Sequence, residues 1–343
     1  MAIESVEVIP YALPFREAYV TARGTLERRE MVLLRLRDDE GATGLGEAVP
    51  MALRGGATLQ RMVAELREYA AAPEAEIAAL SAPARCAVRT AQLDLRARRN
   101  STPLWRELGA SSAAPVRCNA TLAAGEPQAV AKAASAWAAD GFTSFKLKVG
   151  VPKDTDQVAA TCRALGPAAD LRVDANGVWG PAQAVAKIRA LAAEGVSLVE
   201  QPCATLEEMA EVRRRVEPRI AADESVSGLE DAERAKRLAA CDLVTVKVAK
   251  VGGPEAGLGL PLPTYLSSAL DGPVGIASAA HLAQALREHG RDAGIAHGLA
   301  TQRLFASTVA SVECELLGDM LHLPPGPGLG VEIDEAALER HRF

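Results

Sequence analysis

Five charged residues recur along the middle of the chain at nearly equal intervals. They are Lys148, Asp174, Glu200, Asp223 and Lys247, separated by 26, 26, 23 and 24 residues. Each stands at the end of a short apolar segment with the length and composition of a buried strand. In a barrel of parallel strands the carboxyl ends meet at one rim, where residues from different strands converge on a substrate. The spacing therefore predicts one site with three carboxylates and a lysine on either flank.

The use of lysine in this chain is selective. Only eight of the 38 basic residues are lysines, yet Lys146 and Lys148 stand two apart in "SFKLKVG" (144–150), on one face of a predicted strand. Lysine can lose its proton, whereas arginine stays charged. A neighbouring ammonium group and a divalent cation would both lower a lysine pKa toward the working pH. We interpret Lys148 as a base and Lys146 as the group that tunes it; a solvated edge strand is the alternative.

Three carboxylates at one rim would repel one another, and a hard divalent cation would relieve that repulsion. Mg²⁺ suits oxygen ligands and leaves positions for water or substrate, so Asp174, Glu200 and Asp223 are predicted to bind Mg²⁺, with Mn²⁺ as an alternative. Such a cation would stabilise the charge that develops when a lysine removes the proton next to a substrate carboxylate. The alternative is a buried salt-bridge network of the same acids and lysines.

The pattern of segments around these residues predicts an α/β fold with a (β/α)8-type barrel, modified to (β/α)7β. From about residue 115, short apolar runs alternate with segments of helix length, because parallel strands need crossover helices. The candidate strands are 116–122, 143–149, 171–176, 197–202, 219–225, 243–248, 263–270 and 293–299. An open doubly wound sheet is the alternative, although no glycine-rich phosphate loop follows the first strand.

Three regions are predicted along the chain. Residues 1–112, with strand-like runs first and helical patterns after them, indicate an α+β capping domain. Residues 113–304 form the barrel, and residues 305–343 return to the capping domain. The connector 252–263 is rich in glycine and proline, so we expect no full helix there.

Composition excludes several classes of function. A net charge of −6, a pI near 5.6 and 3% aromatic residues argue against a nucleic-acid partner. The six cysteines form no C-x-x-C pair and indicate reduced thiols. No targeting segment or long apolar run is seen, which predicts a cytoplasmic protein with no membrane partner. The expected partner is a small carboxylate substrate, and a homo-oligomer is left open.

The motifs in the barrel region resemble those of the enolase superfamily, specifically its muconate-lactonizing subgroup, over nearly the whole chain. They are "KLK" (146–148), "VDANGVW" (173–179), "EQP" (200–202), "ADES" (222–225) and "VKVAKVGG" (246–253), in the family's order. The resemblance implies that Lys148 is the base on one face and that Lys247 is the base or electrostatic partner on the other. It also implies that Lys146 tunes Lys148.

The same resemblance assigns the remaining rim residues. It implies that Asp174, Glu200 and Asp223 are the metal ligands. It also implies that Asn176 and Glu224 do not bind the metal themselves but lie next to the ligands and hold them in position. No histidine stands at position 247, which argues against the related subgroup whose second base is a histidine.

Within the subgroup, "SSALDGPVGIASAAHLA" (267–283) resembles the o-succinylbenzoate synthase family. That likeness implies a lyase of menaquinone biosynthesis that dehydrates 2-succinyl-6-hydroxy-2,4-cyclohexadiene-1-carboxylate to 2-succinylbenzoate. The alternatives within the subgroup are a racemase or epimerase of N-acylamino acids or dipeptides, and a cycloisomerase. A Schiff-base aldolase and a non-catalytic relative are alternatives from other classes.

The residues that would contact substrate come from two regions. The resemblance places Ser267, Ser268 and Gly298 at the ends of the last two barrel strands. Arg23 or Arg54, in the loops of the capping domain, would pair with a second substrate carboxylate, the alternative being a solvated cation. His297 is expected to have a helper role, and Asp271 to be a turn or cap residue.

Overall fold

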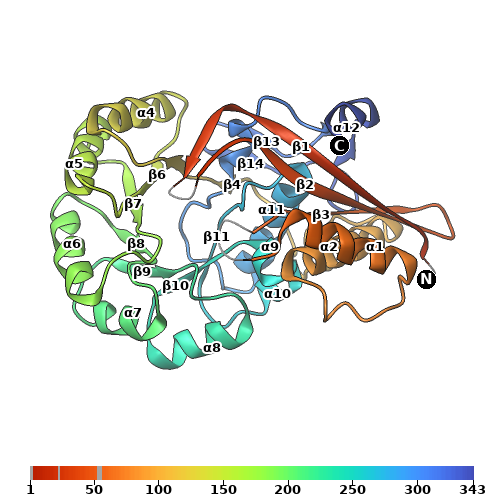
Figure 1. Cartoon of the computed structure of the whole chain (residues 1–343), viewed down its shortest axis with the longest axis horizontal. Coiled ribbons are helices and arrows are strands. Elements are labelled where there is room, and N and C mark those ends of the chain that lie inside the picture. Colours follow the sequence, from red (N-terminus) through yellow and green to blue (C-terminus); the bar gives the residue numbers. More distant parts are fainter. Residues whose placement is uncertain (1–2, 22–23, 52–55) are drawn as a thin grey trace.

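The computed structural model describes residues 3–21, 24–51 and 56–343. Arg23 and Arg54, predicted to contact substrate, lie outside the described residues. Figure 1 shows a ring of strands and outer helices on one side and a layered sheet with two helices on the other. No helix of the described residues is long and apolar enough to cross a membrane.

The N-terminal part is an antiparallel sheet covered on one face by helices. Its strands, in the order β1-β2-β3, are β1 (Ile3–Thr21), β2 (Gly24–Asp38) and β3 (Thr43–Ala48). The helices are α1 (Leu59–Ala71), α2 (Ala82–Arg99) and the short α3 (Leu104–Glu107). Gly44 and Gly46 let α2 lie directly on β3, since a Cβ at either residue would collide with backbone of the helix. We call residues 3–109 of this structure the cap.

The barrel sheet has seven parallel strands in sequential order. They are β5 (Ala120–Leu122), β6 (Ser144–Lys148), β7 (Asp170–Asp174), β8 (Leu198–Glu200), β9 (Arg219–Ala222), β10 (Leu243–Val246) and β11 (Thr264–Leu266). A doubly wound sheet would reverse its strand order at a switch point. The sequential order therefore confirms the predicted barrel and excludes the open sheet.

Helices surround these strands in chain order. They are α4 (Pro127–Ala139), α5 (Asp154–Leu165), α6 (Pro181–Ala193), α7 (Leu206–Arg213), α8 (Leu229–Leu238), α9 (Val248–Val251), α10 (Pro254–Leu258) and α11 (Pro273–Glu288). Proline opens four of them, where its missing N–H leaves no helical bond unmade. The two short helices α9 and α10, separated by Gly252 and Gly253 in left-handed conformations, confirm that the connector 252–263 lacks a full helix.

Three predicted strands differ from the structure. Of residues 263–270, only Thr264–Leu266 form β11, and Ser267 adds a single bridge before bends at Ala269 and Leu270. Residues 116–122 divide into β4 (Val116–Arg117) and β5, of which only β5 joins the barrel sheet. Residues 293–299 form no continuous strand, because Gly294 adopts φ +70° and interrupts the extended run. Instead, His297 bridges Cys118 on one side and Gly298 bridges Ser267 on the other, so that this segment closes the ring by isolated bridges.

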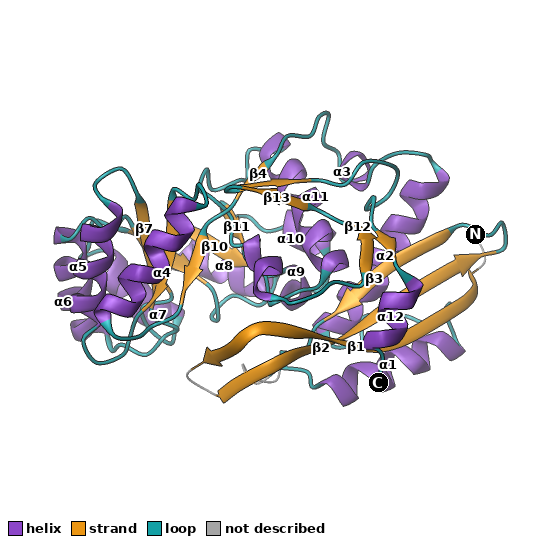
Figure 2. Cartoon of the chain, turned by 90° about the horizontal axis from the view of Figure 1, so that it is seen from above, coloured by secondary structure: helices purple, strands orange, loops and turns teal. Residues whose placement is uncertain are grey.

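The C-terminal residues contact both parts. They form η2 (Ala300–Leu304), β12 (Ala310–Val312), β13 (Glu315–Leu317), β14 (Met320–His322), β15 (Glu332–Ile333) and α12 (Glu335–His341). β14 pairs with β4, whereas Phe305 and Arg342 bridge Phe15 and Tyr11 of β1. Figure 2 shows α12 beside β1 and β2. The domain boundaries at 112 and 304 stay predictions.

Buried polar groups join the cap to the barrel. The Glu47 carboxylate, on β3, accepts hydrogen bonds from the Tyr11 hydroxyl (2.9 Å) and from the backbone N–H of Gly272 (2.7 Å), just before α11. Burial, and then the negative charge of Asp271, raise the pKa of Glu47 to about 7. A Cβ at Gly272 would collide with the Tyr11 hydroxyl, so glycine is needed at this junction.

We expect Glu47 to make the folded protein less stable as the pH rises from about 4.5 to 7. In that range the folded state holds the Glu47 proton that the unfolded state has released, so stability falls with rising pH. Glu47→Gln, a neutral isostere, lacks this dependence. The difference in unfolding free energy between the wild type and Glu47→Gln should fall by about 3 kcal/mol between pH 4 and pH 8, measured by urea denaturation. Parallel stability curves for the two proteins would contradict this.

Candidate active site

The rim residues predicted from their spacing come together in the structure. Lys148 on β6 pairs in register with Asp174 on β7, and Asp174 pairs with Glu200 on β8. Asp223 directly follows β9, and Lys247 directly follows β10. The three acids are essentially inaccessible to solvent, and Lys247 is 3% exposed. Since the sheet order is sequential, the two lysines flank the three acids from opposite sides.

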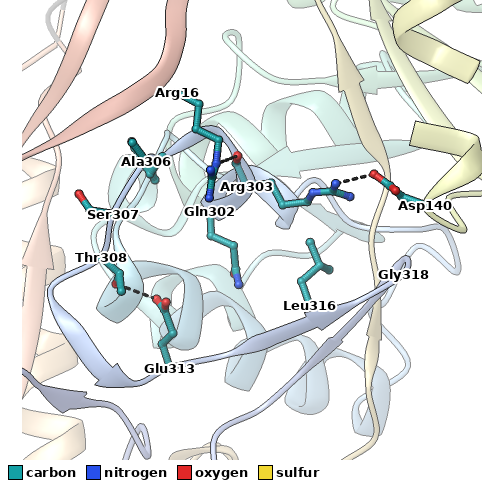
Figure 3. A pocket seen from close by; sticks show the side chains of 11 residues that line it. Arg16, Asp140, Gln302, Arg303, Ala306, Ser307, Thr308, Glu313, Leu316 and Gly318 are labelled. Atoms are coloured by element: carbon teal, nitrogen blue, oxygen red, sulfur yellow. Dashed lines mark hydrogen bonds and ion pairs between the residues drawn. The ribbon is translucent and has the colours of Figure 1, made fainter. Parts of the chain in front are cut away.

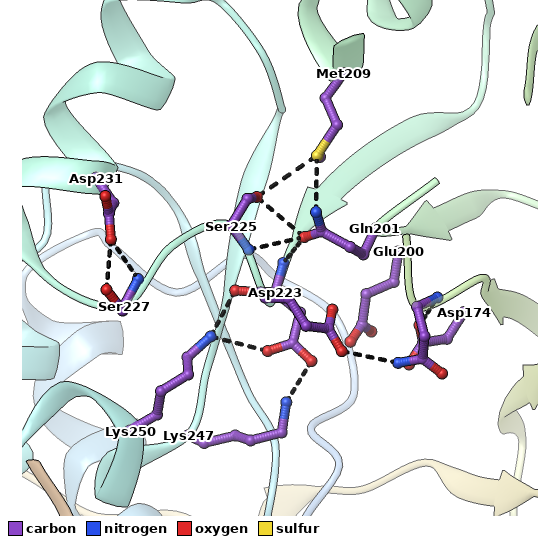
Figure 4. A network of polar contacts seen from close by, with 12 residues as sticks. Asp174, Glu200, Gln201, Met209, Asp223, Ser225, Ser227, Asp231, Lys247 and Lys250 are labelled. Atoms are coloured by element: carbon purple, nitrogen blue, oxygen red, sulfur yellow. Dashed lines mark hydrogen bonds and ion pairs between the residues drawn. The ribbon is translucent and has the colours of Figure 1, made fainter. Parts of the chain in front are cut away.

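Each acid is in contact with a lysine (Figure 4 shows Asp223 and its neighbours). The Lys146 Nζ atom lies 3.0 Å from Asp174 Oδ2 and 2.6 Å from Glu200 Oε2, so one cation serves two carboxylates. Lys148 Nζ donates to the same Asp174 oxygen at 2.5 Å. This arrangement is the salt-bridge network that the sequence left as an alternative to a metal site.

Asp223 receives two lysines. Lys247 Nζ donates to Asp223 Oδ2, and Lys250 Nζ donates to Asp223 Oδ1 at 2.9 Å and to the Asp223 carbonyl at 2.5 Å. The role of Lys250 was missed at the sequence level, although it lies inside the "VKVAKVGG" motif. One turn of α9 brings Lys250 back over the strand end. Residues three apart share a helix face, so the spacing from Lys247 to Lys250 could have predicted this contact.

Charge and burial act against each other in this cluster. Burial alone would raise the pKa of Asp174, but Lys146 and Lys148 outweigh it and hold that pKa below its usual range. Burial and the charge of Asp174 raise the pKa of Glu200 to about 7. Burial by itself would lower the pKa of Lys146, yet Asp174 and Glu200 raise it well above its ordinary value. Lys146 therefore stays cationic here, which suits an electrostatic role and not that of a base.

Two residues with left-handed backbone conformation, Asn176 and Gln201, hold the acids and their neighbours in place. Asn176 (φ +48°) donates its N–H to Asp174 Oδ1 at 3.0 Å and its side-chain amide to Glu224 Oε1 at 3.0 Å, so both residues predicted to support the acids lie next to the site. Gln201 (φ +38°) was not predicted. Its side-chain oxygen accepts from the Asp223 N–H at 2.8 Å and from Ser225, which fixes the start of the 223–225 turn.

The barrel floor below the acids is aromatic and cationic. The Tyr265 ring lies 5.8 Å from Lys146 Nζ and 5.6 Å from the Arg172 guanidinium carbon. The Tyr265 hydroxyl donates to Asn119 Oδ1 at 2.9 Å, so the buried phenol is satisfied. Burial raises the Tyr265 pKa to about 12, which keeps the group neutral. Tyr265, Arg172 and Asn119 were not predicted as part of the site.

The predicted substrate residues on the last strands have different surroundings. Gly298 lies beside Ser267, and a Cβ at position 298 would approach Ser267 Oγ at 3.0 Å. Ser268 Oγ donates to Asp271 Oδ2 at 2.8 Å and accepts from the Asp271 N–H at 2.9 Å, so this hydroxyl is used within the turn. These bonds confirm Asp271 as a turn residue. Contact of Ser267, Ser268 or Gly298 with substrate stays a prediction.

His297 has a structural role. Its Nδ1 atom accepts a hydrogen bond from the Leu266 N–H at 3.0 Å, and its ring stacks on Tyr265. Its other nitrogen lies 3.7 Å from Asp292 Oδ2. The ring is 2% exposed and joins the closing segment to β11, which agrees with a helper role and not with catalysis.

The chemistry of the three acids fits a hard divalent cation. Glu200 Oε1 is buried without a hydrogen-bond partner, which is costly unless a further ligand takes it. Carboxylate oxygens from three adjacent strands form a donor set of the kind that Mg²⁺ prefers. As the side chains stand, no three acidic, histidine or cysteine side chains of the described residues are grouped closely enough to hold a metal. Binding would therefore require the lysine contacts to rearrange.

A separate pocket of about 660 Å³ lies outside the rim, between β1 and residues 302–318 (Figure 3). Arg303, which ion-pairs with Asp140 at 2.5 Å, and the bonded pair Thr308 and Glu313 line it. None of the predicted site residues lines this pocket. The candidate chemistry therefore belongs to the rim, where acids and lysines converge.

Comparison with known proteins places the chain in a family. Residues 128–337 match the model described as "Enolase C-terminal domain-like", and residues 3–109 match the N-terminal domain of mandelate racemase and muconate lactonizing enzyme. The chain belongs to the enolase superfamily. This membership confirms the resemblance that the sequence motifs predicted. The chain is an enzyme of that superfamily and has its fold.

Individual relatives carry different activities. An o-succinylbenzoate synthase from Thermobifida fusca is 43% identical over 209 residues, which cover 57% of this chain and 64% of that protein. Muconate cycloisomerase 1 from Acinetobacter baylyi is 28% identical over 99% of both chains. A dipeptide epimerase from Enterococcus faecalis, solved with Mg and the dipeptide L-Leu-L-Tyr, has a TM-score of 0.88 and 27% identity over 97% of this chain and 100% of that one.

Removing the cation shared by two buried acids should destabilise the metal-free protein. We expect Lys146→Met to lower the unfolding free energy by about 3–5 kcal/mol, because Asp174 and Glu200 would keep buried charge without their common partner. Lys132→Met, on the exposed face of α4, should change it by less than about 0.5 kcal/mol. Urea denaturation in excess chelator measures both. Equal stability of the two variants would mean that the acids take up protons instead.

Proposed function

We propose that this protein is an o-succinylbenzoate synthase: it dehydrates 2-succinyl-6-hydroxy-2,4-cyclohexadiene-1-carboxylate to 2-succinylbenzoate and water, as a lyase of menaquinone biosynthesis. The observation that carries the proposal is the 43% identity to such a synthase over 57% of this chain, whereas the 28% identity to a muconate cycloisomerase extends over 99% of it. The match to the synthase covers 64% of that protein's length. Racemisation or epimerisation of an N-acylamino acid or dipeptide is the second candidate, favoured by the structural likeness to an epimerase.

The proposed metal ligands are Asp174, Glu200 and Asp223. When bound there, Mg²⁺, or Mn²⁺ in its place, would stabilise the negative charge that develops on the substrate carboxylate. The unpartnered Glu200 oxygen and the all-carboxylate donor set support this assignment. Lys146 keeps a positive charge between two of these acids.

Lys148 is the proposed base. Its side chain is 26% exposed, the most accessible of the lysines at the acids, and it reaches the rim next to Asp174. It takes the proton from the ring carbon that carries the carboxylate, and the electron pair of that C–H bond forms the new ring double bond as the neighbouring hydroxyl leaves. The conjugate acid of Lys148 returns the proton to the leaving hydroxyl, which departs as water. Aromatisation makes the step favourable, so the site needs to orient substrate and stabilise charge.

Lys247 is proposed to stabilise, from the opposite side, the negative charge that develops as the proton is removed. It lies across the three acidic strand ends from Lys148, so the two ammonium groups would approach a substrate held between them from opposite sides. In a racemase, by contrast, both lysines would exchange protons with the same carbon. The division of labour between Lys148 and Lys247 therefore distinguishes the two candidate functions.

Substitution of each proposed metal ligand should abolish turnover and weaken cation binding. Asp174→Asn, Glu200→Gln and Asp223→Asn should each reduce kcat by at least about 100-fold, because charge stabilisation in the transition state is lost. Glu233→Gln, at an exposed position of α8, is the matched control. Titration calorimetry with MgCl₂ and the activity assay measure both effects. Full activity of the wild type in excess chelator would contradict the metal assignment.

The lysine variants test the reaction. Lys148→Arg keeps the charge but cannot accept a proton, so it should lower dehydration by about 10²–10⁴-fold, with a smaller loss for Lys247→Arg. Lys132→Arg is the control. The dehydration assay follows the ultraviolet absorbance of the aromatic product, alongside polarimetry on N-succinylamino acids in deuterated buffer. Efficient racemisation with negligible dehydration, and equal losses in both lysine variants, would replace the proposed function by the second candidate.

A further inference from the structure

The turn after the last regular barrel strand, residues 267–272, is held by side chains of the cap. Arg29, on β2 and 7% exposed, donates from one terminal nitrogen to the carbonyls of Ala269 (2.8 Å) and Pro50 (2.8 Å). Its Nε atom lies 3.4 Å from the Leu270 carbonyl. Glu47, 4% exposed, accepts from the Gly272 N–H at the other end of the turn. Two buried polar side chains of the cap therefore bind the backbone of one barrel turn at both ends.

The turn needs external support. Leu270 adopts φ +65°, in the left-handed region, where the Cβ atom of a leucine crowds the following carbonyl oxygen. Inside the turn, Ser268 and Asp271 bond to one another. The carbonyls of Ala269 and Leu270 point outward, toward Arg29. Without the cap, the carbonyls of Ala269 and Leu270 would lose the hydrogen-bond donor that Arg29 supplies.

The same turn carries a residue at the rim. Ser267 and Tyr265 lie two apart along the extended chain, so their side chains share the inner face of the barrel, with Ser267 nearer the carboxyl end. The Tyr265 ring lies under Lys146, and Ser267 borders Gly298. A shift of the turn would therefore move the Ser267 hydroxyl relative to the lysines and acids while leaving β6 to β9 in place.

We propose that Glu47 and Arg29 are positioning residues: from the cap, they hold the 267–272 turn so that the Ser267 hydroxyl is aimed at the substrate. The inference rests on the proposed function in so far as Ser267 contacts substrate. Arg29 also donates to the Pro50 carbonyl, so one guanidinium group ties the turn to the segment that follows β3. The cap thus sets substrate affinity through backbone contacts with the barrel, besides any side chain of its own that reaches substrate.

The first test measures the contact without any substrate. Amide hydrogen exchange is followed by mass spectrometry in peptides that cover residues 267–276, in the wild type, Glu47→Ala and Arg29→Lys. We expect exchange to rise by about tenfold or more in both variants, because the turn opens locally. Glu30→Ala, a partly exposed acid on β2 that pairs with Arg28, should leave the exchange unchanged. Unchanged protection in both cap variants would overturn the proposal.

The second test asks whether the cap residues act through Ser267. Arg29→Lys and Glu47→Ala should each raise KM by about tenfold with kcat within about threefold, since the proposed base on β6 stays in place. Combined with Ser267→Ala, neither should raise KM further than Ser267→Ala alone. A merely structural role would give additive effects, or a loss of kcat that follows thermal stability, and either result would overturn the proposal.

A failure of the proposed function is distinguishable from a failure of this inference. The kinetic test uses whichever substrate, the cyclohexadiene carboxylate or an N-succinylamino acid, the wild type turns over, so a racemase would test it equally well. If the wild type turns over neither, the proposed function fails, and the exchange measurement alone decides whether the cap holds the turn.

Discussion

The ammonium group of Lys146 lies between the carboxylates of Asp174 and Glu200, and the rim of the barrel depends on that contact. These acids are buried on neighbouring strands, where unpaired charges would cost several kcal/mol each. Lys148 also pairs with Asp174, and Lys247 and Lys250 both pair with Asp223. Four ammonium groups therefore offset the negative charge of the three acids. The cluster is compact because Lys146 projects from within β6, and the other members project from a strand end or from the first turn after one.

The pairing of lysines with these acids affects how a divalent cation could bind. Lysines that neutralise the acids in the structure also occupy most of the oxygens that a divalent cation would need, while one oxygen of Glu200 stays unpartnered. A cation and a substrate carboxylate entering together would replace part of the lysine contacts and leave the ammonium groups directed at the substrate. The same groups thus serve both the stability of the buried acids and the proposed proton transfer.

The superfamily shows why the rim alone does not decide the reaction. Relatives with synthase, cycloisomerase and epimerase activities share the fold, and a fold supports many reactions. What can differ lies around the acids: the turn at 267–272, the closing segment near Gly298 and the cap. In this chain the cap contacts the barrel through buried polar groups, such as Glu47 with Gly272, and through Arg89 with the Gly252 carbonyl after α9. Both junctions adjoin loops that carry rim residues.

Much of the site followed from the sequence. Parallel strands joined by helices stand in sequential order, so residues at successive strand ends become neighbours, and the spacing from Lys148 to Lys247 was enough to bring five side chains to one rim. Alternation along 144–148 placed Lys146 beside Lys148. Only the tertiary structure decided the rest. Lys250 reaches Asp223 because α9 is a single turn, and Gly294 breaks the eighth strand although its neighbours are apolar. Glu47 meets Gly272 across 225 residues, because that contact depends on how the cap packs against the barrel, which no local periodicity records.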